Sequence, residues 1–264
     1  INVLSEKHLF RQELERLGLP CPRFVSFGVE ESAEQLVDRL REVGYPLLVK
    51  PTDSSGSKGV TVLHEEDLAA LESALESARR YNRNGVLLAE EMVPQTFPRI
   101  IGGDIFVYEG RVVFWGLMGA IRDESLGGLV PVGEAYPACL PPATEQQVRA
   151  DLQALVSGLD LHFGEMNVEV LIGPQGVPYI IELAGRAGGN MIPLQLQDLS
   201  GHNLVRASVL CALGQDPGAV DFDRSDDAYA TYMLHALETG TFVGVDIDPA
   251  VRDAIYRQDL FVQP

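Results

Sequence analysis

Cysteine is scarce in this sequence, and the spacing of its cysteines excludes two classes of site. Cys21, Cys139 and Cys211 lie far apart and form neither a CxxC pair nor a cluster with histidine. This pattern argues against a disulfide framework and against a zinc site of the usual spacing. It predicts reduced thiols in a cytoplasmic protein.

The sequence also lacks an apolar run long enough to cross a bilayer, although 46% of its 264 residues are apolar. No secretory signal segment opens it. We therefore expect a soluble globular protein without a membrane partner. The first residue is Ile1 rather than Met, which leads us to expect a piece of a longer chain.

Positive charge is in short supply, because 20 Lys and Arg stand against 38 Asp and Glu, for a net charge of −18. We expect no nucleic-acid partner, since that function requires a basic surface. Only three basic residues are lysines: Lys7, Lys50 and Lys58. A lysine retained where arginine is the common cation suggests a need for a compact point charge, with chance as the alternative.

Apolar periodicity and turn residues predict that the first part of the chain alternates helices and strands. Residues 20–91 are expected to form one α/β unit that contains a β-hairpin. The expected helices are 5–17, 32–44 and 65–82, and the expected strands are 20–28, 46–50, 59–64 and 86–91.

The second part is predicted to begin with two antiparallel strands that turn at Glu109-Gly110. The Gly- and Pro-rich segment 119–142 is expected to be irregular, either a binding loop or a surface excursion. A helix over 143–159, strands over 164–172 and 177–183, and helices within 192–213 are expected to follow.

A loop rich in glycine and serine, KPTDSSGSKG at 50–59, joins two predicted strands. Small residues let backbone N–H groups approach an anion, and a lysine near each end can neutralise phosphate. The loop is neither a P-loop nor a GxGxxG turn, because it lacks both spacings and leads into a strand. A mobile phosphate cover is one interpretation, and an ordinary hairpin loop is the other.

Two glutamates lie in the hairpin predicted around Gly173–Gly176. If these residues form a tight turn, Asn167 faces Glu182. Glu169 then faces Ile180, and the two glutamates share one face with Asn167. Carboxylates on a diagonal of a mainly apolar face repel each other unless a cation lies between them.

Mg²⁺ is suited to that position, because it binds one or two carboxylates and completes its shell with water and phosphate oxygens. The alternatives are a solvent-exposed polar face without metal, or a bulge that turns one carboxylate away.

An arginine follows the second glutamate in a glycine-rich turn, ELAGRAGGN from Glu182 to Asn190. Arg186 is placed there to hold a transferring phosphoryl group or a substrate carboxylate. A structural ion pair with one of the many acids is the alternative.

Taken in order along the chain, these segments resemble the ATP-grasp superfamily. They are the helix with Lys7, then YPLLVKP, SSGSKGV, LLAEEMV, GDIFV, NVEVLI and YIIELAGRAGGN. The resemblance covers nearly the whole chain and is greatest to the branch of biotin carboxylase, carbamoyl-phosphate synthetase and carboxylate–amine ligases. It implies an α+β fold of two α/β lobes, each with a mainly antiparallel sheet, with ATP bound between them.

The resemblance also implies a division of the chain. Residues 1–19 are expected to form a linking helix, residues 20–91 a small lid lobe, and residues 92–264 a large lobe that carries the metal site and is truncated at its C-terminus. The α/β domain that usually precedes these lobes is expected to be absent.

Roles are implied position by position. Lys7 and Lys50 are expected to contact ATP phosphates. Glu169 and Glu182 are expected to bind the metal ion, and Arg186 to act beside the γ-phosphate and the acyl acceptor. Lys50 and Arg186 are the expected catalytic residues. Further nucleotide contacts are expected in the loop, the hinge strand and the last turn, at Ser55, Gly56, Ser57, Lys58, Gly59, Glu90, Glu91, Val93 and Asn190.

The implied activity is an ADP-forming ligase that uses ATP and Mg²⁺, or Mn²⁺ in its place, to activate a carboxylate as an acyl phosphate and join it to an amine. The expected partners are small-molecule carboxylate and amine substrates, and a homodimer is one expected assembly. Ala184 departs from the pattern, because many members carry a ligand Asn there; Asn167 or Asn190 could replace it. Biotin carboxylase-like activation of bicarbonate, a non-catalytic ATP-binding regulatory domain and a scaffold are the alternatives.

Overall fold

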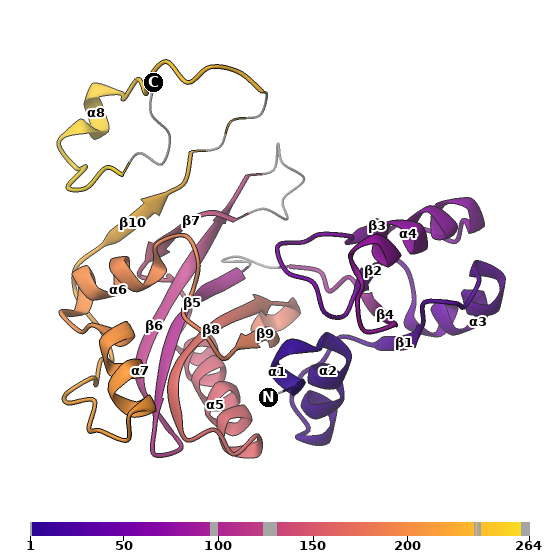
Figure 1. The fold of residues 1–264 in the computed structure, drawn as a ribbon, viewed down its shortest axis with the longest axis horizontal. Helices are drawn as coiled ribbons and strands as arrows, with labels where there is room; N and C mark the ends of the chain where they lie inside the picture. The colour runs from indigo at the N-terminus through magenta and orange to yellow at the C-terminus, as the bar shows by residue number, and fades with distance from the viewer. Residues whose placement is uncertain (1, 96–99, 124–130, 235, 237–238, 260–264) are drawn as a thin grey trace. The chain divides into compact units, whose positions relative to one another are not determined.

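The computed structural model of the chain describes residues 2–95, 100–123, 131–234, 236 and 239–259. Residues 1–233 cluster into one unit and residues 234–264 into a second. The first unit contains two antiparallel sheets with helices packed on them (Figure 1). The predicted α+β class is therefore confirmed, while the predicted lobe boundaries stay a prediction.

The small sheet has four strands in the order β1-β4-β2-β3, and all neighbours are antiparallel. The pairing of β2 with β3 confirms the predicted hairpin. The elements of this sheet and its two helices are β1 (Phe24–Gly28), α3 (Ala33–Val43), β2 (Leu47–Pro51), β3 (Thr61–Leu63), α4 (Leu68–Tyr81) and β4 (Val86–Glu91).

Helices α3 and α4 form where apolar residues recur at helical spacing. In α3 the buried side chains include Leu36 and Leu40, and in α4 they include Leu71 and Leu75. The helix α4 begins at Asp67, whose carboxylate accepts hydrogen bonds from two backbone N–H groups of the first turn. Both helices therefore present one apolar side to the sheet.

The two faces of the small sheet differ in chemistry. Leu47, Val49 and Leu87 pack in the apolar cluster that contains the inner sides of α3 and α4. Because side chains alternate along a strand, Lys50 of β2 and Glu90 of β4 lie on the other face. The candidate site residues Lys50 and Glu90 are thus on the face that α3 and α4 leave uncovered.

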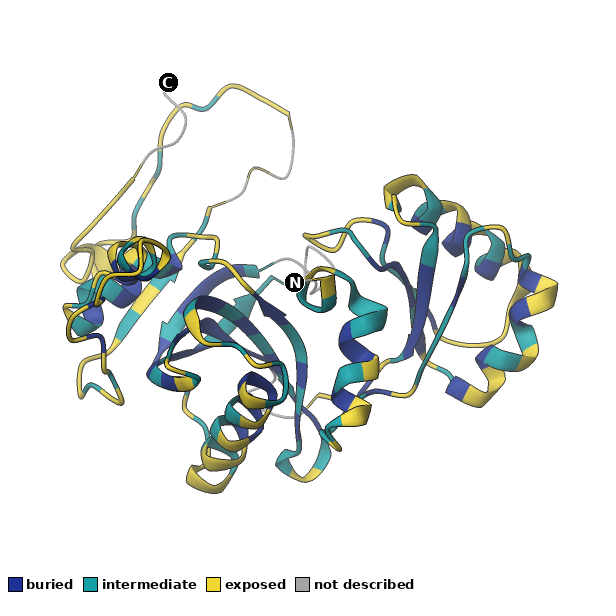
Figure 2. Ribbon diagram, turned by 60° about the horizontal axis from the view of Figure 1, so that its bottom comes forward, coloured by how far each residue is buried: buried dark blue, intermediate teal, exposed yellow. Residues whose placement is uncertain are grey.

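The large sheet has six strands in the order β10-β7-β6-β5-β8-β9. Helices α2 and α5 cover one face, and α6 and α7 pack on part of the other. In Figure 2 the helices are buried on their inner sides and exposed on their outer sides. The elements are α2 (Lys7–Arg16), β5 (Ile100–Tyr108), β6 (Arg111–Arg122), β7 (Pro131–Tyr136), α5 (Pro142–Gly158), β8 (Phe163–Ile172), η2 (Pro174–Gly176), β9 (Pro178–Ala184), α6 (Ile192–Ser200), α7 (Leu204–Ala212) and β10 (Tyr229–Tyr232).

Two expected boundaries were wrong. The helix predicted from Ser5 is divided into α1 (Asn2–Ser5) and α2, because Glu6 has an extended backbone between them. The segment 119–142 is not irregular throughout, since it contains the end of β6 and the whole of β7. Glu134 is a charged residue at a buried position of β7. The sequence of β7 therefore lacks the apolar–polar alternation by which a strand is predicted. The part of this segment at 124–130 lies outside the described residues.

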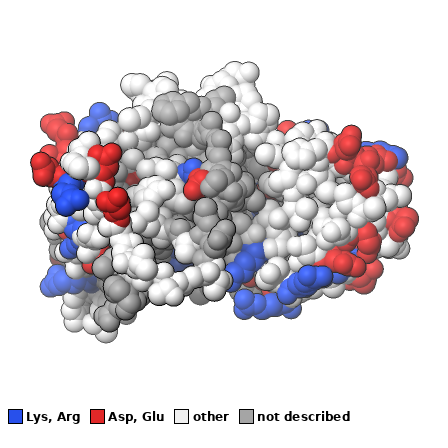
Figure 3. All heavy atoms as spheres, turned by 90° about the horizontal axis from the view of Figure 1, so that it is seen from above, with Lys and Arg blue, Asp and Glu red and all other residues white. Residues whose placement is uncertain are grey.

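The second unit contains the short helix α8 (Pro249–Arg252) in its described part, where most side chains are exposed. On the face of the molecule shown in Figure 3, acidic side chains are interspersed with basic ones. Within the described residues, none of the helices is both long enough and apolar enough to span a membrane.

Gly103 in β5 occupies a position where a side chain does not fit. Its φ is +113°, and a Cβ atom there would lie 2.0 Å from the carbonyl oxygen of Gly116. We expect Gly103→Ala to lower the free energy of unfolding by about 2 kcal/mol, because it adds backbone strain and a clash. A urea titration measures this loss. Gly189→Ala is the matched control, since its Cβ would meet nothing within 4 Å; equal losses in the two variants would contradict the steric explanation.

Candidate functional site

Lys7, the first residue of α2, lies at the base of the glycine-rich loop. Its backbone N–H donates to the carbonyl of Thr52 at 2.9 Å, and its Nζ donates to the carbonyl of Ser54. Burial lowers the pKa of Lys7, while the negative charge of Glu182 acts in the opposite direction. The structure therefore brings Lys7, the loop and one predicted metal ligand within electrostatic range of one another.

Lys50 lies in a buried cluster of three charged side chains. Its Nζ donates to Oε1 of Glu90, and Nε of Arg11 donates to Oε2 of the same carboxylate at 3.0 Å. None of the three side chains is more than 7% exposed. Burial lowers the pKa of Lys50. Burial would raise the pKa of Glu90, but Arg11 and Lys50 outweigh it and hold that pKa at about 2.

Arg11 is a residue that the sequence reasoning missed. Its side chain is fully buried, and its Nη1 also donates to the carbonyl of Ile181 in β9 at 3.0 Å. One guanidinium thus joins α2 to the small sheet through Glu90 and to the large sheet through Ile181. The signal that could have identified it is its place one helical turn after Lys7, on the same side of α2.

The hinge residues of β4 are already engaged with neighbouring strands. The N–H of Glu91 donates to the carbonyl of Arg23 at 2.8 Å, and Glu91 Oε2 accepts from Arg23 Nε at 3.0 Å. The N–H of Met92 donates to the carbonyl of Pro46 at 3.0 Å, and Val93 is buried. The adenine contacts expected here from Glu90, Glu91 and Val93 stay a prediction.

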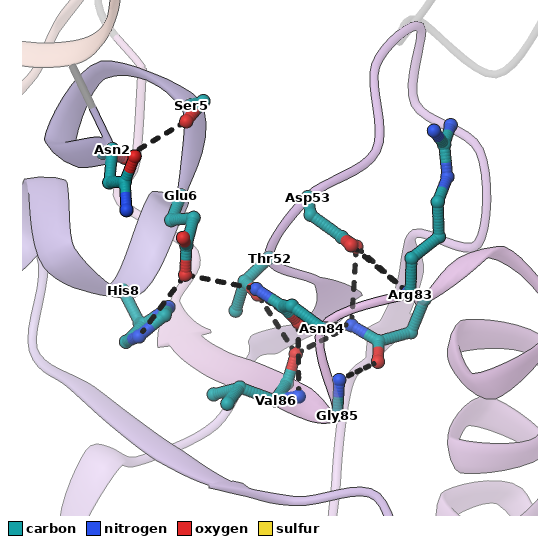
Figure 4. A network of polar contacts seen from close by, with 11 residues as sticks. Asn2, Ser5, Glu6, His8, Thr52, Asp53, Arg83, Asn84, Gly85 and Val86 are labelled. Carbon is teal, nitrogen blue, oxygen red and sulfur yellow. Dashed lines mark hydrogen bonds and ion pairs between the residues drawn. The ribbon is translucent and has the colours of Figure 1, made fainter.

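The glycine-rich loop is fastened at its base and exposed at its tip. Figure 4 shows the base, where Asn84 Nδ2 donates to Glu6 at 3.1 Å and Asp53 accepts from the N–H of Arg83 at 3.0 Å. Ser55, Gly56, Ser57 and Lys58 are exposed, whereas Gly59 is buried with φ of +72°. Lys58 does not join the buried cluster around Lys50. It lines a cavity of about 280 Å³ whose other walls include Arg80 and Arg83.

The two predicted metal ligands face each other across the hairpin of β8 and β9. Glu169 is directly opposite Glu182, and Asn167 is opposite Ala184. The predicted register, with Glu169 facing Ile180, was wrong by two residues. On the turn side Val170 faces Ile180 instead of Tyr179, which is a shift of one residue, and a bulge after Glu169 inserts one extra residue, Ile181, into β9 and adds the second shift. Together the two shifts do not turn a carboxylate away; they convert the expected diagonal pair into a directly opposed pair.

Two arginines offset the repulsion between these carboxylates. Arg122 Nη2 lies 2.7 Å from Glu169 Oε1, and Arg186 Nη2 lies 3.8 Å from Glu182 Oε1. The expectation named a metal ion alone as the compensating cation, so Arg122 was missed. It is the last residue of β6, a strand that is not a sequence neighbour of the hairpin, and no pattern in the sequence placed it there.

The residues fit Mg²⁺ in a limited sense. The side chains of Glu169 and Glu182 are 36% and 39% exposed, so both carboxylates can reach a cation at the surface of the sheet. Within the described residues, no group of three or more His, Cys, Asp or Glu side chains could hold a metal. Two carboxylates agree with Mg²⁺, which completes its shell with water and nucleotide oxygens.

Asp104 fixes the turn that carries Arg186. Its two oxygens accept hydrogen bonds from the N–H of Gly188 and from Nδ2 of Asn167, each at 2.9 Å. Arg186 itself donates to Asn167 Oδ1 at 3.3 Å. The predicted site residue Asn190 is exposed, with φ of +50°, and its nucleotide contact stays a prediction. Asn167, opposite Ala184, is the better placed of the two amides considered for the missing ligand.

Glu165 is a second buried acid that the sequence reasoning missed, beside Asp104. Burial, together with the hydrogen-bonded Asp104 carboxylate, raises the pKa of Glu165 to about 8. Asp104 has backbone and amide donors, so the shared proton belongs to Glu165. Its position two residues before Asn167 in β8 was available in the sequence, but its pairing with Asp104 required the alignment of β5 with β8.

We expect Glu165→Gln to change the pH dependence of stability. A carboxyl whose folded pKa is about 8 keeps its proton when folded and loses it when unfolded above its ordinary pKa. Stability therefore falls as the pH rises from about 5 to 8, by at most about 1.4 kcal/mol per unit. Glutamine has no proton to lose, so Glu165→Gln should gain stability relative to wild type across this window. Urea titrations at several pH values measure the difference; the exposed-site control Glu76→Gln should show none, and a constant offset for Glu165→Gln would refute the assignment.

The fold and site together define an ATP-grasp protein. Two antiparallel sheets with helices packed on them match the α+β fold that the resemblance implied, whereas the roles of the individual site residues stay a prediction. The chain belongs to the family of the carbamoyl-phosphate synthase L chain ATP-binding domain, whose model matches residues 6–216. The predicted membership of the ATP-grasp superfamily and the predicted fold are thereby confirmed.

Curated relatives agree with this membership. The chain is 25% identical over 227 residues to the carbamoyl phosphate synthase large chain of Xanthomonas axonopodis pv. citri, covering 81% of this chain and 19% of that protein. It is also 25% identical over 219 residues to the vancomycin C-type resistance protein VanC1 of Enterococcus gallinarum, covering 81% of this chain and 63% of that protein. The chain spans about a fifth of the length of the synthase large chain.

Solved structures support the fold. The L-amino acid ligase of Bacillus licheniformis superposes with a TM-score of 0.74 at 21% identity, covering 91% of this chain and 58% of that one. Biotin carboxylase of Campylobacter jejuni gives a TM-score of 0.66 at 22% identity, covering 77% and 45%. A biotin carboxylase domain of Hydrogenobacter thermophilus, solved with MgADP and bicarbonate, gives 0.66 at 19% identity, covering 81% and 46%.

Proposed function

We propose that the chain is the ATP-binding part of an ADP-forming ligase that activates a carboxylate and joins it to an amine. The observation that carries the proposal is the direct opposition of Glu169 and Glu182 on one sheet face. Lys7 lies near enough to this face for the charge of Glu182 to act on its pKa. Paired carboxylates beside lysines match the needs of a metal-bound triphosphate. Membership of a family of ATP-binding domains supports the same conclusion.

The reaction has two steps. An oxygen of the substrate carboxylate attacks the γ-phosphorus of ATP, and the bond to the bridging β-phosphate oxygen breaks to release ADP. The amine nitrogen then attacks the carbonyl carbon of the acyl phosphate, the carbon–oxygen bond to phosphate breaks, and the amine proton passes to phosphate or solvent. Neither step needs a protein nucleophile, so catalysis consists of positioning and charge stabilisation.

Each charged residue has a role in this scheme. Lys7 and Lys50 bind phosphate oxygens, and the exposed loop from Ser55 to Lys58 closes over them. Arg186 holds the transferring phosphoryl group or the substrate carboxylate. The Lys50 ammonium group donates a hydrogen bond to Glu90 in this structure. It must therefore divide its hydrogen bonds between Glu90 and the nucleotide.

Glu169 and Glu182 would hold Mg²⁺, which when bound neutralises phosphate charge during transfer. The Arg122 guanidinium now on Glu169 would have to yield at least part of that contact to the metal ion. Asn167 supplies an amide oxygen on the same face. Mn²⁺ in place of Mg²⁺, a homodimeric assembly and a cytoplasmic location stay predictions.

A phosphate-release screen tests the proposal. The intact protein that contains this chain is incubated with ATP, Mg²⁺ and pairs of small carboxylic acids and amino compounds. We expect phosphate release that requires one acid and one amine together. Release that requires bicarbonate instead would indicate carboxylation, and nucleotide binding without release for any pair would indicate a regulatory domain.

A further inference from the structure

Glu134 in β7 is a buried acid that the proposed reaction does not yet use. Its side chain lies on the sheet face that carries Glu169, and the residue is only 5% exposed. Within the described residues its Oε2 has no hydrogen-bond partner. A buried carboxylate oxygen without a partner is costly, so its retention calls for a ligand that the ligand-free chain lacks.

Gly102 gives this carboxylate its direction. A Cβ atom on Gly102 would lie 3.1 Å from Glu134 Oε2, so the carboxylate extends over the glycine of β5. The pairs Ile101–Val170 and Asp104–Asn167 keep one register between β5 and β8, which sets Gly102 beside Glu169. The absence of a side chain at 102 therefore leaves room for the Glu134 carboxylate over β5, with the proposed metal ligand Glu169 on the other side of Gly102.

The backbone of Glu134 is held firmly. Its carbonyl accepts a hydrogen bond from Gln195 Nε2 at 3.3 Å, and Gln195 in turn accepts from Thr231 Oγ1 at 2.6 Å. The residue is thus fixed between α6 and β10, and its carboxylate extends over Gly102 from a rigid strand.

The charges around Glu134 determine which ligand it can bind. Burial and the negative charges of Glu169 and Asp104 raise the pKa of Glu134, Arg122 lowers it, and the net result is a pKa of about 8. The Arg122 guanidinium contacts Glu169 at 2.7 Å. An arriving cation would stabilise the carboxylate of Glu134, and a neutral or anionic ligand would not.

We propose that Glu134 binds the ammonium group of the amino-compound substrate, beside the nucleotide and metal site. This assignment rests on the proposed ligase function, because it places an amine next to the group that is activated. A compact ammonium with several N–H donors suits a buried carboxylate oxygen that lacks a hydrogen-bond partner within the described residues. The substrate class is therefore an amine or amino acid that binds as a cation.

Titration calorimetry tests the assignment without requiring turnover. Wild type and Glu134→Gln are titrated with L-alanine, L-leucine and L-phenylalanine, each beside its matched acid without the amino group: propionate, 4-methylpentanoate and 3-phenylpropionate. Both proteins are measured with and without Mg²⁺ and a non-hydrolysable ATP analogue. Glutamine keeps the shape of the side chain and removes only its charge, and Glu145→Gln on α5 is the control for charge removal elsewhere.

For at least one pair, we expect wild type to bind the amino compound about tenfold or more tightly than its matched acid. This preference should vanish in Glu134→Gln and persist in Glu145→Gln, while affinity for the Mg²⁺–nucleotide complex stays unchanged. Absence of any preference in wild type, or its persistence in Glu134→Gln, would overturn the assignment. So would a loss of Mg²⁺ affinity alone in Glu134→Gln, which would make Glu134 a partner of the metal site. Failure of nucleotide binding would count against the ligase proposal, and the titrations without nucleotide would still decide the role of Glu134.

Discussion

We expect Arg11→Met to lower the free energy of unfolding by about 3–5 kcal/mol. The guanidinium is fully buried and bonds both Glu90 and the carbonyl of Ile181. Methionine fills a similar volume but leaves both acceptors with one partner fewer in a medium that penalises unpaired charge. A urea titration followed by circular dichroism measures the loss.

The exposed arginine Arg41 provides the control for Arg11. It contacts Glu66 and Asp38 at the surface, where water and salt screen the charges. Arg41→Met should therefore leave the urea midpoint unchanged within error. If Arg11→Met behaved like Arg41→Met, the buried cluster would not be what joins the two sheets to α2.

The second large effect concerns activity. We expect Glu182→Gln to reduce the rate of ATP-dependent phosphate release by at least about 100-fold, because a neutral amide binds Mg²⁺ far more weakly than a carboxylate. The variant also removes the negative charge that interacts with the Lys7 ammonium group. The rate is measured on the intact protein with the substrates that the screen identifies.

A urea titration of Glu182→Gln shows whether a loss of activity is due to unfolding or to the missing carboxylate. The side chain of Glu182 is 39% exposed, so its replacement should leave the urea midpoint near that of wild type. Glu72→Gln on α4 should change neither quantity. A Glu182→Gln protein that is folded and releases phosphate at the wild-type rate would exclude Glu182 from the reaction.

Much of the architecture was predictable because it is encoded locally. Helical spacing identified α3 and α4, and the period-two pattern after the loop at 50–59 identified the β2–β3 hairpin. Strand alternation predicted a shared face for Glu169 and Glu182, and the structure has one because two one-residue register shifts add up to two. The superfamily followed from the order of several short segments, which no single segment would have carried.

The errors arose where distant strands meet. The register of the β8–β9 hairpin differs from the predicted one by one residue at the turn and by one more at the bulge. The bulged residue Ile181 is bonded through its carbonyl to Arg11, 170 positions away in sequence, so turn length alone could not set the register. Arg122, Asp104 and Glu134 reach the site from β6, β5 and β7, and their convergence depends on the strand order of the sheet. From the sequence alone a buried acid such as Glu134 is predicted to lie at the surface, because its burial depends on glycine and small neighbours in other strands.

The most direct test of the central claim measures how Glu169 and Glu182 share one divalent cation. Affinity for a non-hydrolysable ATP analogue is determined with and without Mg²⁺ for wild type, Glu169→Gln, Glu182→Gln and the double variant. We predict that each single variant loses the Mg²⁺-dependent gain in affinity and that the double variant loses no more, as expected for two ligands of one ion. Retention of the full gain in either single variant would contradict the account.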